Sequence, residues 1–529
     1  MAAPLRRTRA EWLVLAALVL GYGGCALALG QSSNWDLRNY HWYDGWAWLQ
    51  GRGQLDLAVA QAQTWFNPVL PAALYLLLSS LAAWQGTFLL GCIQGLNLLP
   101  LHRICLQLLP APWQQRRWLA LLIAFAGASG ATMRGELGAT FGDNLVSLPL
   151  LGALALLLVA QEHDLRHGLG RVLGAGALLG LAAGLKLTAA PFAAGIALAA
   201  PLLLDGDQAR RARLRLLALL GASALAAFLL VNGHWMLGLY REFGNPLFPL
   251  FGHWFGGDFA PPAELRDSRW LPRGWQEWLF YPLVWADTPR RVSEGGFLDL
   301  RIPLLFLAAL ALPLWRRRAL APSPPLRRAV DFVLLAAALA YLAWLALFGY
   351  YRYLVVLEML APALLVVACA ALPRRAVAAA TFALLAVLIL ATRPVQWSRL
   401  PRHGAQYIEV QLPPRADLAT ALVVFGDGEP LGFLAPSFPA GTRFVRIAGN
   451  LLGPPLPEWA LDRAVRQRLR EHRGPLYLIS ADPAAERLHQ ALQRQQLELD
   501  RDSCAGIGSN LFQGEPLPQL CVLRHSTTP

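Results

Sequence analysis

The chain has 529 residues, of which 56% are hydrophobic and 15% are charged. Its mean hydropathy of +0.41 and its recurring long apolar runs exclude an ordinary water-soluble enzyme and are typical of a polytopic membrane protein. The formal net charge of +13 does not indicate a nucleic-acid partner, because the arginines form short clusters between apolar runs, as cytoplasmic loops require.

The first apolar run, at about residues 11–30, is long enough to cross a bilayer. Arg6, Arg7 and Arg9 precede it and predict a cytoplasmic N-terminus. The run lacks a convincing signal-peptide cleavage site, so we interpret it as the first membrane helix.

Threading the chain so that every basic cluster falls on the cytoplasmic side predicts about eleven membrane helices. Two long outer loops, at about residues 31–85 and 232–300, follow the first and the seventh helix. The remaining helices are expected at about 86–109, 118–132 and 144–160, twice within 172–204, at 214–231, before Arg316, from Arg328 to Phe348, before Arg374 and before Thr392.

The last part of the chain changes in character from long apolar runs to short, mixed ones. It holds two strand-like and two amphipathic helical runs, which predict a small α/β domain on the outer face. These runs are Ala421–Phe425, Leu476–Ser480, Leu461–Glu471 and Ala484–Gln496. The predicted division is a transmembrane domain at 1–395 and an extracytoplasmic α/β domain at 396–529.

Cys504 and Cys521 are the only cysteines of this C-terminal region. They can form a disulfide if the region faces an oxidising compartment, but spacing alone fixes no connectivity, so both states stay open.

Six charged residues collect on the predicted outer side, near the level of the lipid headgroups, where charges are costly to hold and are often functional. They are Asp36, Asp44, Glu136, Asp143, Lys186 and Arg352. Asp36 directly follows the first helix within an aromatic stretch, which favours a catalytic role over helix capping or solubility.

Six short motifs are distributed over roughly residues 1–395. They are Asn34-Trp35-Asp36, Asn67-Pro68, Gly142-Asp143-Asn144, Gly184-Leu185-Lys186-Leu187-Thr188, Asn245-Pro246-Leu247-Phe248-Pro249 and Arg352-Tyr353. In this combination the chain resembles the GT-C superfamily of integral-membrane glycosyltransferases, in particular its largely uncharacterised bacterial branches. The resemblance implies a GT-C-like fold and a polyprenyl-phosphate-linked sugar donor used on the outer face.

Sugar transfer from a lipid phosphate needs a carboxylate that takes the acceptor's proton and positive charge on the departing phosphate. We assign the first role to Asp36 and the second to Arg352 and Lys186. Asp143 is a second catalytic candidate; it either binds a divalent metal ion (Mg²⁺ or Mn²⁺) together with Asp36 or caps its helix.

Seven further residues are expected to bind substrate: Trp35, Arg38, Tyr40, His41, Asn67, Asn245 and Tyr353. The aromatic members either stack on sugar rings or belong to an interfacial belt, since both use the same residue types. His41 either positions its loop through a hydrogen bond or binds an ion.

The sequence thus predicts an inverting glycosyltransferase of the bacterial inner membrane with its active site on the periplasmic face. The acceptor is a lipid, a glycan or a protein. Two alternatives stay open, a lipid-linked oligosaccharide polymerase or ligase and a transporter or flippase of lipid-linked sugars. Functional charges at mid-membrane and internal repeats would favour a transporter, and arginine-rich outer loops would favour a polymerase or ligase.

Overall fold

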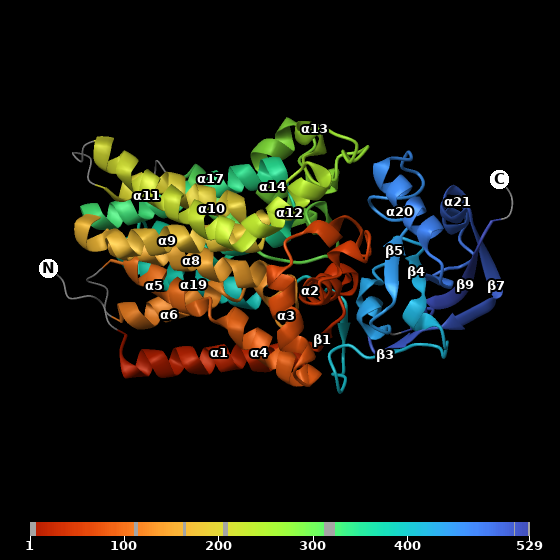
Figure 1. Cartoon of the computed structure of the whole chain (residues 1–529). Helices are drawn as coiled ribbons and strands as arrows, with labels where there is room; N and C mark the ends of the chain where they lie inside the picture. Colours follow the sequence, from red (N-terminus) through yellow and green to blue (C-terminus); the bar gives the residue numbers. More distant parts are fainter. Residues whose placement is uncertain are drawn as a thin grey trace. The chain divides into compact units, whose positions relative to one another are not determined.

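The computed structural model describes residues 7–110, 115–161, 165–204, 210–311, 323–512 and 514–526. Its chain divides into two compact units, each assembled from three segments of the sequence (Figure 1). The helical unit comprises Met1–Leu29, Phe88–Asn232 and Asp267–Trp397, and the α/β unit comprises Gly30–Thr87, Gly233–Arg266 and Ser398–Pro529.

The helical unit is built almost entirely of apolar helices joined by short turns. Its helices, with α4 shared across the boundary, are α1 (Arg9–Leu29), α4 (Ala83–Gly95), α5 (Leu98–Leu108), α6 (Arg116–Gly127), α7 (Ala131–Gly135), α8 (Asp143–Ala160), α9 (Leu165–Leu185), η4 (Leu187–Ala189), α10 (Ala190–Ala199), η5 (Ala200–Leu203), α11 (Arg210–Phe228), η6 (Leu229–Gly233), η7 (Ser268–Trp270), α14 (Trp275–Asp287), η8 (Pro289–Arg291), α15 (Arg301–Leu310), α17 (Pro324–Leu347), η9 (Tyr351–Leu354), α18 (Val355–Cys369) and α19 (Arg374–Leu390).

Within the described residues, seven helical stretches are long and apolar enough to cross a membrane. Each of the eleven predicted membrane-helix ranges contains a helix, and the shorter ones include α10, α15 and α19. The chain is therefore an α-helical polytopic membrane protein, as its composition predicts. The basic cluster Arg316–Arg318, which the prediction uses to end a helix, lies outside the described residues.

Small residues let the helices of this unit pack closely. In α9, a Cβ on Gly180 would come within 1.9 Å of the backbone oxygen of Ala224 on α11, and one on Gly176 within 1.9 Å of the Ser223 hydroxyl. Glycines spaced by four residues lie on one face of a helix, so this face lets α9 and α11 approach.

The α/β unit combines short helices from the two predicted outer loops with the C-terminal sheet. Its helices are η1 (Leu37–His41), α2 (Trp42–Leu49), η2 (Arg52–Gln54), η3 (Gln61–Trp65), α3 (Val69–Ser79), α12 (His234–Phe243), α13 (Gly252–Phe255), η10 (Leu418–Thr420), η11 (Gly432–Ser437), α20 (Ala460–Glu471) and α21 (Glu486–Arg494). Its strands are β1 (Gln31–Ser32), β2 (Arg399–Leu400), β3 (Val410–Gln411), β4 (Leu422–Phe425), β5 (Arg443–Arg446), β6 (Leu476–Ser480), β7 (Leu497–Gly506), β8 (Gly508–Ser509) and β9 (Gln519–His525).

The main sheet has the strand order β5-β4-β6-β9-β7. Strands β5, β4 and β6 are parallel, whereas β9 runs antiparallel to both β6 and β7. All residues of β4 and β6 are buried, which is why both read as continuous apolar runs in the sequence. The predicted strands and amphipathic helices of this region are confirmed.

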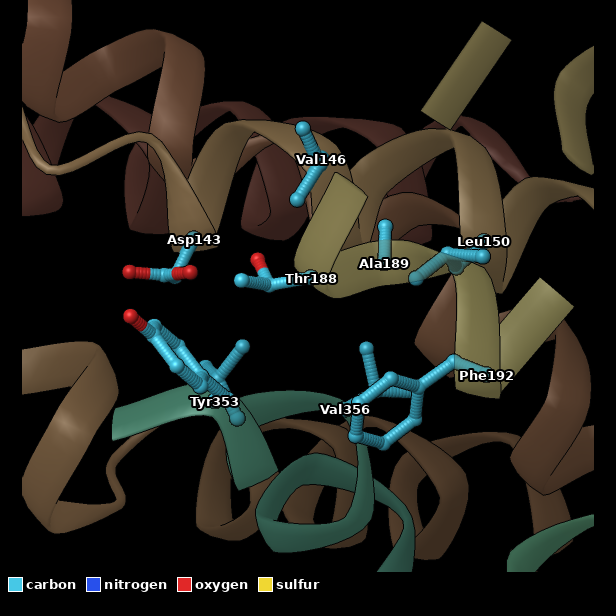
Figure 2. A pocket seen from close by; sticks show the side chains of 9 residues that line it. Asp143, Val146, Leu150, Thr188, Ala189, Phe192, Tyr353 and Val356 are labelled. Carbon is cyan, nitrogen blue, oxygen red and sulfur yellow. The ribbon is translucent and has the colours of Figure 1, made fainter. Parts of the chain in front are cut away.

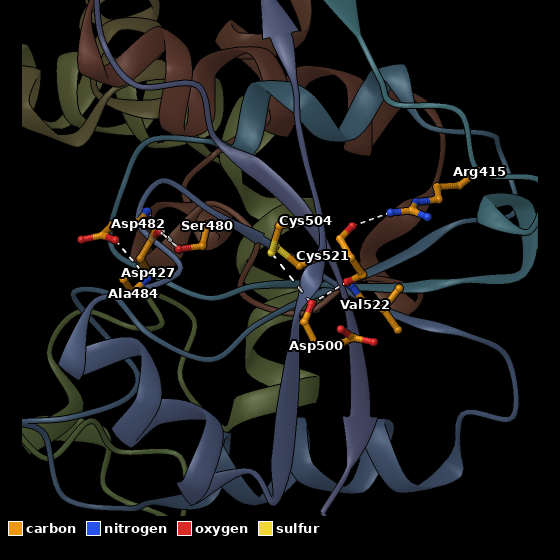
Figure 3. Close-up of a disulfide and its surroundings, with 10 residues drawn as sticks. Arg415, Asp427, Ser480, Asp482, Ala484, Asp500, Cys504, Cys521 and Val522 are labelled. Carbon is orange, nitrogen blue, oxygen red and sulfur yellow. Dashed lines mark hydrogen bonds between the residues drawn. A yellow bond between two sulfur atoms is a disulfide. The ribbon is translucent and has the colours of Figure 1, made fainter.

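Cys504 and Cys521 form a disulfide that joins β7 to the neighbouring strand β9 (Figure 3). The structure thus resolves the alternative that spacing left open. A disulfide persists in an oxidising compartment, which is the condition under which the sequence predicts this pairing.

The three chain segments that make up the α/β unit constrain the membrane topology. Segments from 30–87, 233–266 and 398–529 pack into one unit, so they must lie on one side of the bilayer. An even number of crossings must therefore separate them. The predicted threading meets this condition, with helices two to seven between the first pair and helices eight to eleven between the second.

We expect single cysteines placed in each of the three segments to be labelled from the same side of the membrane. Suitable exposed positions are Gln54→Cys, Asp258→Cys and Ser437→Cys in a background without the four free cysteines, with Arg210→Cys as the control for the opposite face. Labelling of intact cells with a membrane-impermeant maleimide should modify the first three and spare the control. If one of the three is protected like the control, the shared-face topology is wrong.

Candidate functional site

Four of the predicted site residues, Asp143, Lys186, Arg352 and Tyr353, meet in the helical unit. Asp143 is the first residue of α8, and its Oδ1 lies 2.6 Å from Nζ of Lys186, which follows α9 directly. Its Oδ2 lies 3.1 Å from Nε of Arg352 in η9. One carboxylate therefore bridges two cations from different helices, and its side chain is only 3% exposed. The lone lysine has the partner that a charge among apolar helices requires.

Glu136 completes this charged cluster. Its Oε1 lies 3.7 Å from Arg352 Nε, and the residue is fully buried. Burial raises the pKa of Glu136 well above its usual range, the nearby Asp143 carboxylate raises it further, and Arg352 lowers it. Burial and the neighbouring Asp143 carboxylate therefore act against the charged form of Glu136, and Arg352 acts in its favour.

Aromatic rings surround the two cations. The Arg352 guanidinium carbon lies 4.3 Å from the ring centre of Phe141 and 5.5 Å from that of Tyr353. Lys186 Nζ lies 5.4 Å from the Tyr353 ring and also donates to the Phe141 carbonyl oxygen at 2.8 Å. These ring contacts hold the cations by attraction to the aromatic faces.

Two side-chain amides, those of Gln94 in α4 and of Asn97 just after α4, hold the turn before α8. Gln94 Nε2 donates to the carbonyl oxygens of Glu136 and Ala139, and its Oε1 accepts from the Gly138 amide at 2.7 Å. Asn97 Nδ2 donates to the Asn144 carbonyl at 2.7 Å. The carboxylates of the cluster therefore sit on a backbone whose polar groups are satisfied by buried side chains.

The short helix α7, just before Glu136, is capped by buried carboxylates from distant elements. Glu358 of α18 accepts from the amides of Thr132 and Met133 at 3.0 and 3.1 Å, and Asp299 accepts from the Ala131 amide at 2.8 Å. Both acids are 2% exposed or less. Carboxylates at a helix N-terminus satisfy its free amides and its dipole.

Arg301 pairs with one of these two acids. It pairs with Asp299 at 2.8 Å and donates to the Ala126 carbonyl, the Ser129 hydroxyl and the Thr392 hydroxyl. Because α18 follows η9 directly, the same stretch of chain supplies Arg352 to one end of the 131–144 turn and Glu358 to the other.

A narrow cavity of about 10 Å³ begins at this cluster. Figure 2 shows Asp143, Thr188 and the hydroxyl end of Tyr353 at one end, and Leu150 and Phe192 at the other. The lining is completed by Val146, Ala189, Val355 and Val356. The cavity therefore passes from charged and polar groups into apolar side chains of α8, α10 and α18.

Asp36 lies in the α/β unit, immediately before the π-helical turn η1. Its neighbour Trp35 is 40% exposed, as a ring available to a ligand or to lipid must be. Arg38 pairs with Glu515 at 3.2 Å. A π-helical turn is rare and is frequent at functional sites, and the catalytic role of this stretch stays a prediction.

The other predicted binding residues of this unit have visible structural contacts. Tyr40 and His41 are buried, with ring centres 4.1 Å apart. The Asn67 side chain accepts from the Val69 amide at 2.8 Å at the start of α3. Asn245 accepts from the Leu247 amide and donates to the Leu250 carbonyl, so it folds its own proline-containing loop.

Asp44 is a buried acid with a different environment. Neither of its carboxylate oxygens has a hydrogen-bond partner among the described residues, and the residue is 4% exposed. Burial raises the pKa of Asp44 well above its usual range, so the neutral acid is favoured in the folded chain.

The residues do not fit a resident metal ion well. Both Asp143 oxygens already face cations. No group of three or more His, Cys, Asp or Glu side chains in the described part of the chain is placed to hold a metal. The predicted metal shared by Asp36 and Asp143 therefore enters no step of the chemistry below.

The residues that support the Asp143–Lys186–Arg352 cluster are not predicted from the sequence. Glu358, Asp299 and Arg301 have no predicted role, although a charged residue inside an apolar run such as Glu358 is itself a signal. Helix capping is the alternative role predicted for Asp143. In the structure Gly142 is the N-cap residue, with φ of +89°, and the Asp143 carboxylate contacts the two cations instead.

No protein family and no curated protein matches the chain in sequence. Among solved structures, the chain is similar to the crystal structure of ArnT from Cupriavidus metallidurans bound to undecaprenyl phosphate, with 16% identity and a TM-score of 0.47. That similarity covers 73% of this chain and 64% of the ArnT chain, so the chain spans less than two thirds of its length. The chain is also similar to the crystal structure of the Archaeoglobus fulgidus oligosaccharyltransferase in the apo form, with 12% identity, a TM-score of 0.43 and coverage of 97% of this chain and 76% of that one.

Gly130→Ala should destabilise the 131–144 turn. A Cβ at Gly130 would lie 1.9 Å from Glu358 Oε1, and the buried, hydrogen-bonded Glu358 cannot simply turn away. Overpacking of this kind costs about 1–3 kcal/mol, so the thermal unfolding midpoint of the purified protein should fall. The control is Gly221→Ala on α11, where nothing lies within 4 Å of the new Cβ. Equal unfolding midpoints for the two variants would show that the Glu358 contact is dispensable.

Proposed function

We propose that the protein is a GT-C-type membrane glycosyltransferase that moves a sugar from a polyprenyl-phosphate donor to an acceptor on the periplasmic face of a bacterial inner membrane. One observation carries the proposal. Lys186 and Arg352 both pair with Asp143, and Asp143 lines the polar end of a cavity whose other walls are mostly apolar. A lipid phosphate has the same two-part chemistry, an anion joined to a hydrocarbon chain.

The cations suit the phosphate end of such a donor. Arginine offers a planar fork of donors that matches phosphate oxygens, and lysine adds a compact point charge. Positive charge aimed at the departing phosphate stabilises the charge that develops as the bond to the sugar breaks. Asp143 keeps both cations in place, so we assign it a positioning role beside its predicted catalytic one.

The apolar end of the cavity suits the first isoprene unit of the chain. Its walls are aliphatic and aromatic side chains, among them Leu150 and Phe192. With a volume of about 10 Å³ the cavity has room for no more than about one water molecule, so its apolar side chains must move apart before a prenyl chain can enter. Transfer of hydrocarbon from one apolar environment to another adds little driving force, which leaves the phosphate contacts to set the affinity.

We assign the acceptor side of the reaction to Asp36. The acceptor hydroxyl oxygen attacks the anomeric carbon of the donor sugar. The bond between that carbon and the phosphate oxygen breaks, and the hydroxyl proton passes to the Asp36 carboxylate. Attack on the face opposite the leaving phosphate inverts the anomeric configuration. The products are the glycosylated acceptor and polyprenyl phosphate.

Arg352→Lys should weaken phosphate binding while the protein still folds. Lysine keeps the positive charge between Glu136 and Asp143 but loses the forked geometry, so the Kd for undecaprenyl phosphate should rise about tenfold. The measurement is microscale thermophoresis or intrinsic Trp quenching in detergent. The matched control is Arg290→Lys, an exposed arginine of the same unit. An unchanged Kd for Arg352→Lys and for Arg352→Ala would remove Arg352 from the phosphate site.

Asp36→Asn should fold, bind undecaprenyl phosphate as wild type and lose turnover. Asparagine keeps the shape of the side chain but cannot take the acceptor proton, and loss of a general base costs about 10²–10⁴-fold in rate. Transfer is measured in nanodiscs from radiolabelled undecaprenyl-phosphate sugars to an envelope extract that supplies the acceptor. Turnover within about threefold of wild type would exclude Asp36 as the base, because that loss is far smaller than the loss of general-base catalysis.

A further inference from the structure

Asp36 and the η1 residues that follow it, Leu37–His41, are called the Asp36 turn here. This turn is held by residues of the C-terminal sheet region, more than 350 positions further along the chain. We propose that the C-terminal region is a positioning element of the transfer site, and that Gly432 and Gln61 are the positioning residues through which it sets the Asp36 turn. This inference rests on the proposed role of Asp36.

The turn after Asp36 depends on outside support. The π-helical geometry of η1 is unusual, and its residue Asn39 is fully buried. Asn34 Oδ1 accepts from the Leu37 amide at 2.9 Å and so begins the turn. Asn39 Nδ2 donates to the Ala60 carbonyl at 3.1 Å, which ties the turn to the segment before η3.

Gln61 carries this connection into the C-terminal region. Its Nε2 donates to Asn39 Oδ1 at 3.2 Å and to the Gly428 carbonyl at 3.0 Å, and its Oε1 accepts from the Asn450 amide at 2.8 Å. Gly428 and Asn450 lie in the loops that follow the parallel strands β4 and β5. A single buried amide therefore links the Asp36 turn to both strand ends.

The backbone at residues 58–61 is strained, and contacts with the neighbouring strands offset the cost of this strain. Ala58 and Gln61 have φ of +58° and +60°, a conformation that costs side-chain-bearing residues about 1 kcal/mol or more. Such residues persist where the surroundings over-determine them, and they gather at functional sites. Gln61 adopts this conformation and directs its amide into the strand-end loops.

Main-chain pairing adds a second connection. The Leu57 amide donates to the Phe444 carbonyl at 2.9 Å, and the Arg446 amide donates to the Leu57 carbonyl at 3.1 Å, so Leu57 extends the edge of β5. Arg446 Nε also donates to the Val59 carbonyl at 2.8 Å. Burial lowers the pKa of Arg446 to about 10, and the guanidinium remains charged at neutral pH.

A buried ion pair completes this edge. Asp56 accepts from Arg52 Nε at 2.6 Å and from the Phe444 amide at 3.1 Å. Arg52 also donates to the carbonyls of Ala440 and Thr442. A buried pair with these extra hydrogen bonds fixes a geometry, because removing either partner leaves a charge unpaired in the interior.

Gly432 brings η11 directly against the turn. A Cβ at Gly432 would lie 2.2 Å from the Asn39 carbonyl oxygen, so only glycine allows this approach. Gly428, four residues earlier in the loop that leads into η11, differs in this respect. Its nearest neighbour to an added Cβ is the Gly449 Cα at 3.6 Å, an ordinary contact. The two glycines thus form a matched pair for an experiment.

The test compares full-length Gly432→Ala with Gly428→Ala in detergent. Hydrogen–deuterium exchange of residues 34–43 should increase in Gly432→Ala only, while exchange in β4 and β6 stays slow. Turnover should fall at least about tenfold, as expected for a misplaced base, with the undecaprenyl phosphate Kd within about twofold of wild type. Slow exchange in β4 and β6 reports that the sheet is intact, and retention of the Cys504–Cys521 disulfide, measured by mass spectrometry without reduction, reports that the covalent link between β7 and β9 has formed.

Gln61→Ala serves as a second variant in case Gly432→Ala does not fold, because it removes the amide link without adding an atom. It should show the same exchange and the same turnover loss. Wild-type exchange at 34–43 in both variants would overturn the inference. If Asp36→Asn is inactive while both positioning variants turn over normally, the inference fails and the proposed function stands. If Asp36→Asn is fully active, the proposed function fails first.

Discussion

The contact on which the helical unit depends is the Asp143 carboxylate between Lys186 and Arg352. Among apolar helices a lone charge is strongly unfavourable, and removing one partner of a buried pair costs about 3–5 kcal/mol. Asp143 starts α8, Lys186 follows α9 and Arg352 precedes α18. Pairing these three charges therefore fixes the start of α8, the end of α9 and the start of α18 relative to one another. The apolar side chains of the three helices pack in the positions that this pairing sets.

The second buried set keeps the first one in place. Glu358 and Asp299 cap α7, and Arg301 pairs with Asp299 while it donates to the Ala126 carbonyl oxygen. Without a cap, the free amides of α7 would be buried unsatisfied at about 1–3 kcal/mol each. The turn that carries Glu136 and Asp143 is thus determined from both ends by α18 and its preceding turn.

The sequence predicts helices and strands well where burial is continuous. Each of the predicted membrane ranges contains a helix, and β4 and β6 follow from fully apolar runs. The turn at Lys186 is predictable because a long apolar run has to reverse there. The caps by Glu358 join residues 225 and 226 positions apart, and periodicity holds no information about such partners.

The assembly of the α/β unit escapes sequence reasoning for a related reason. Leu57 meets β5 as one isolated bridge, and a single bridge leaves no repeating pattern in either segment. The predicted boundary at residue 395 separates these segments, whereas the contacts group residues 30–87 and 233–266 with the chain after Trp397. The connection between residues 30–87 and the C-terminal sheet is evident only from buried polar residues, such as Asn39 and Gln61, whose hydrogen-bond partners are distant in the sequence.

The separation of these contacts also orders the folding of the chain. Asp56 and Phe444 are 388 positions apart, so the Asp36 turn lacks its partners until the last membrane helix has been inserted and the sheet has formed. Contacts of long sequence separation form late because the entropy of loop closure must be lost before they stabilise anything. Until then Asn39, Gln61 and the Arg52–Asp56 pair are exposed to water. The turn that carries the proposed base therefore acquires its geometry only in a completed chain.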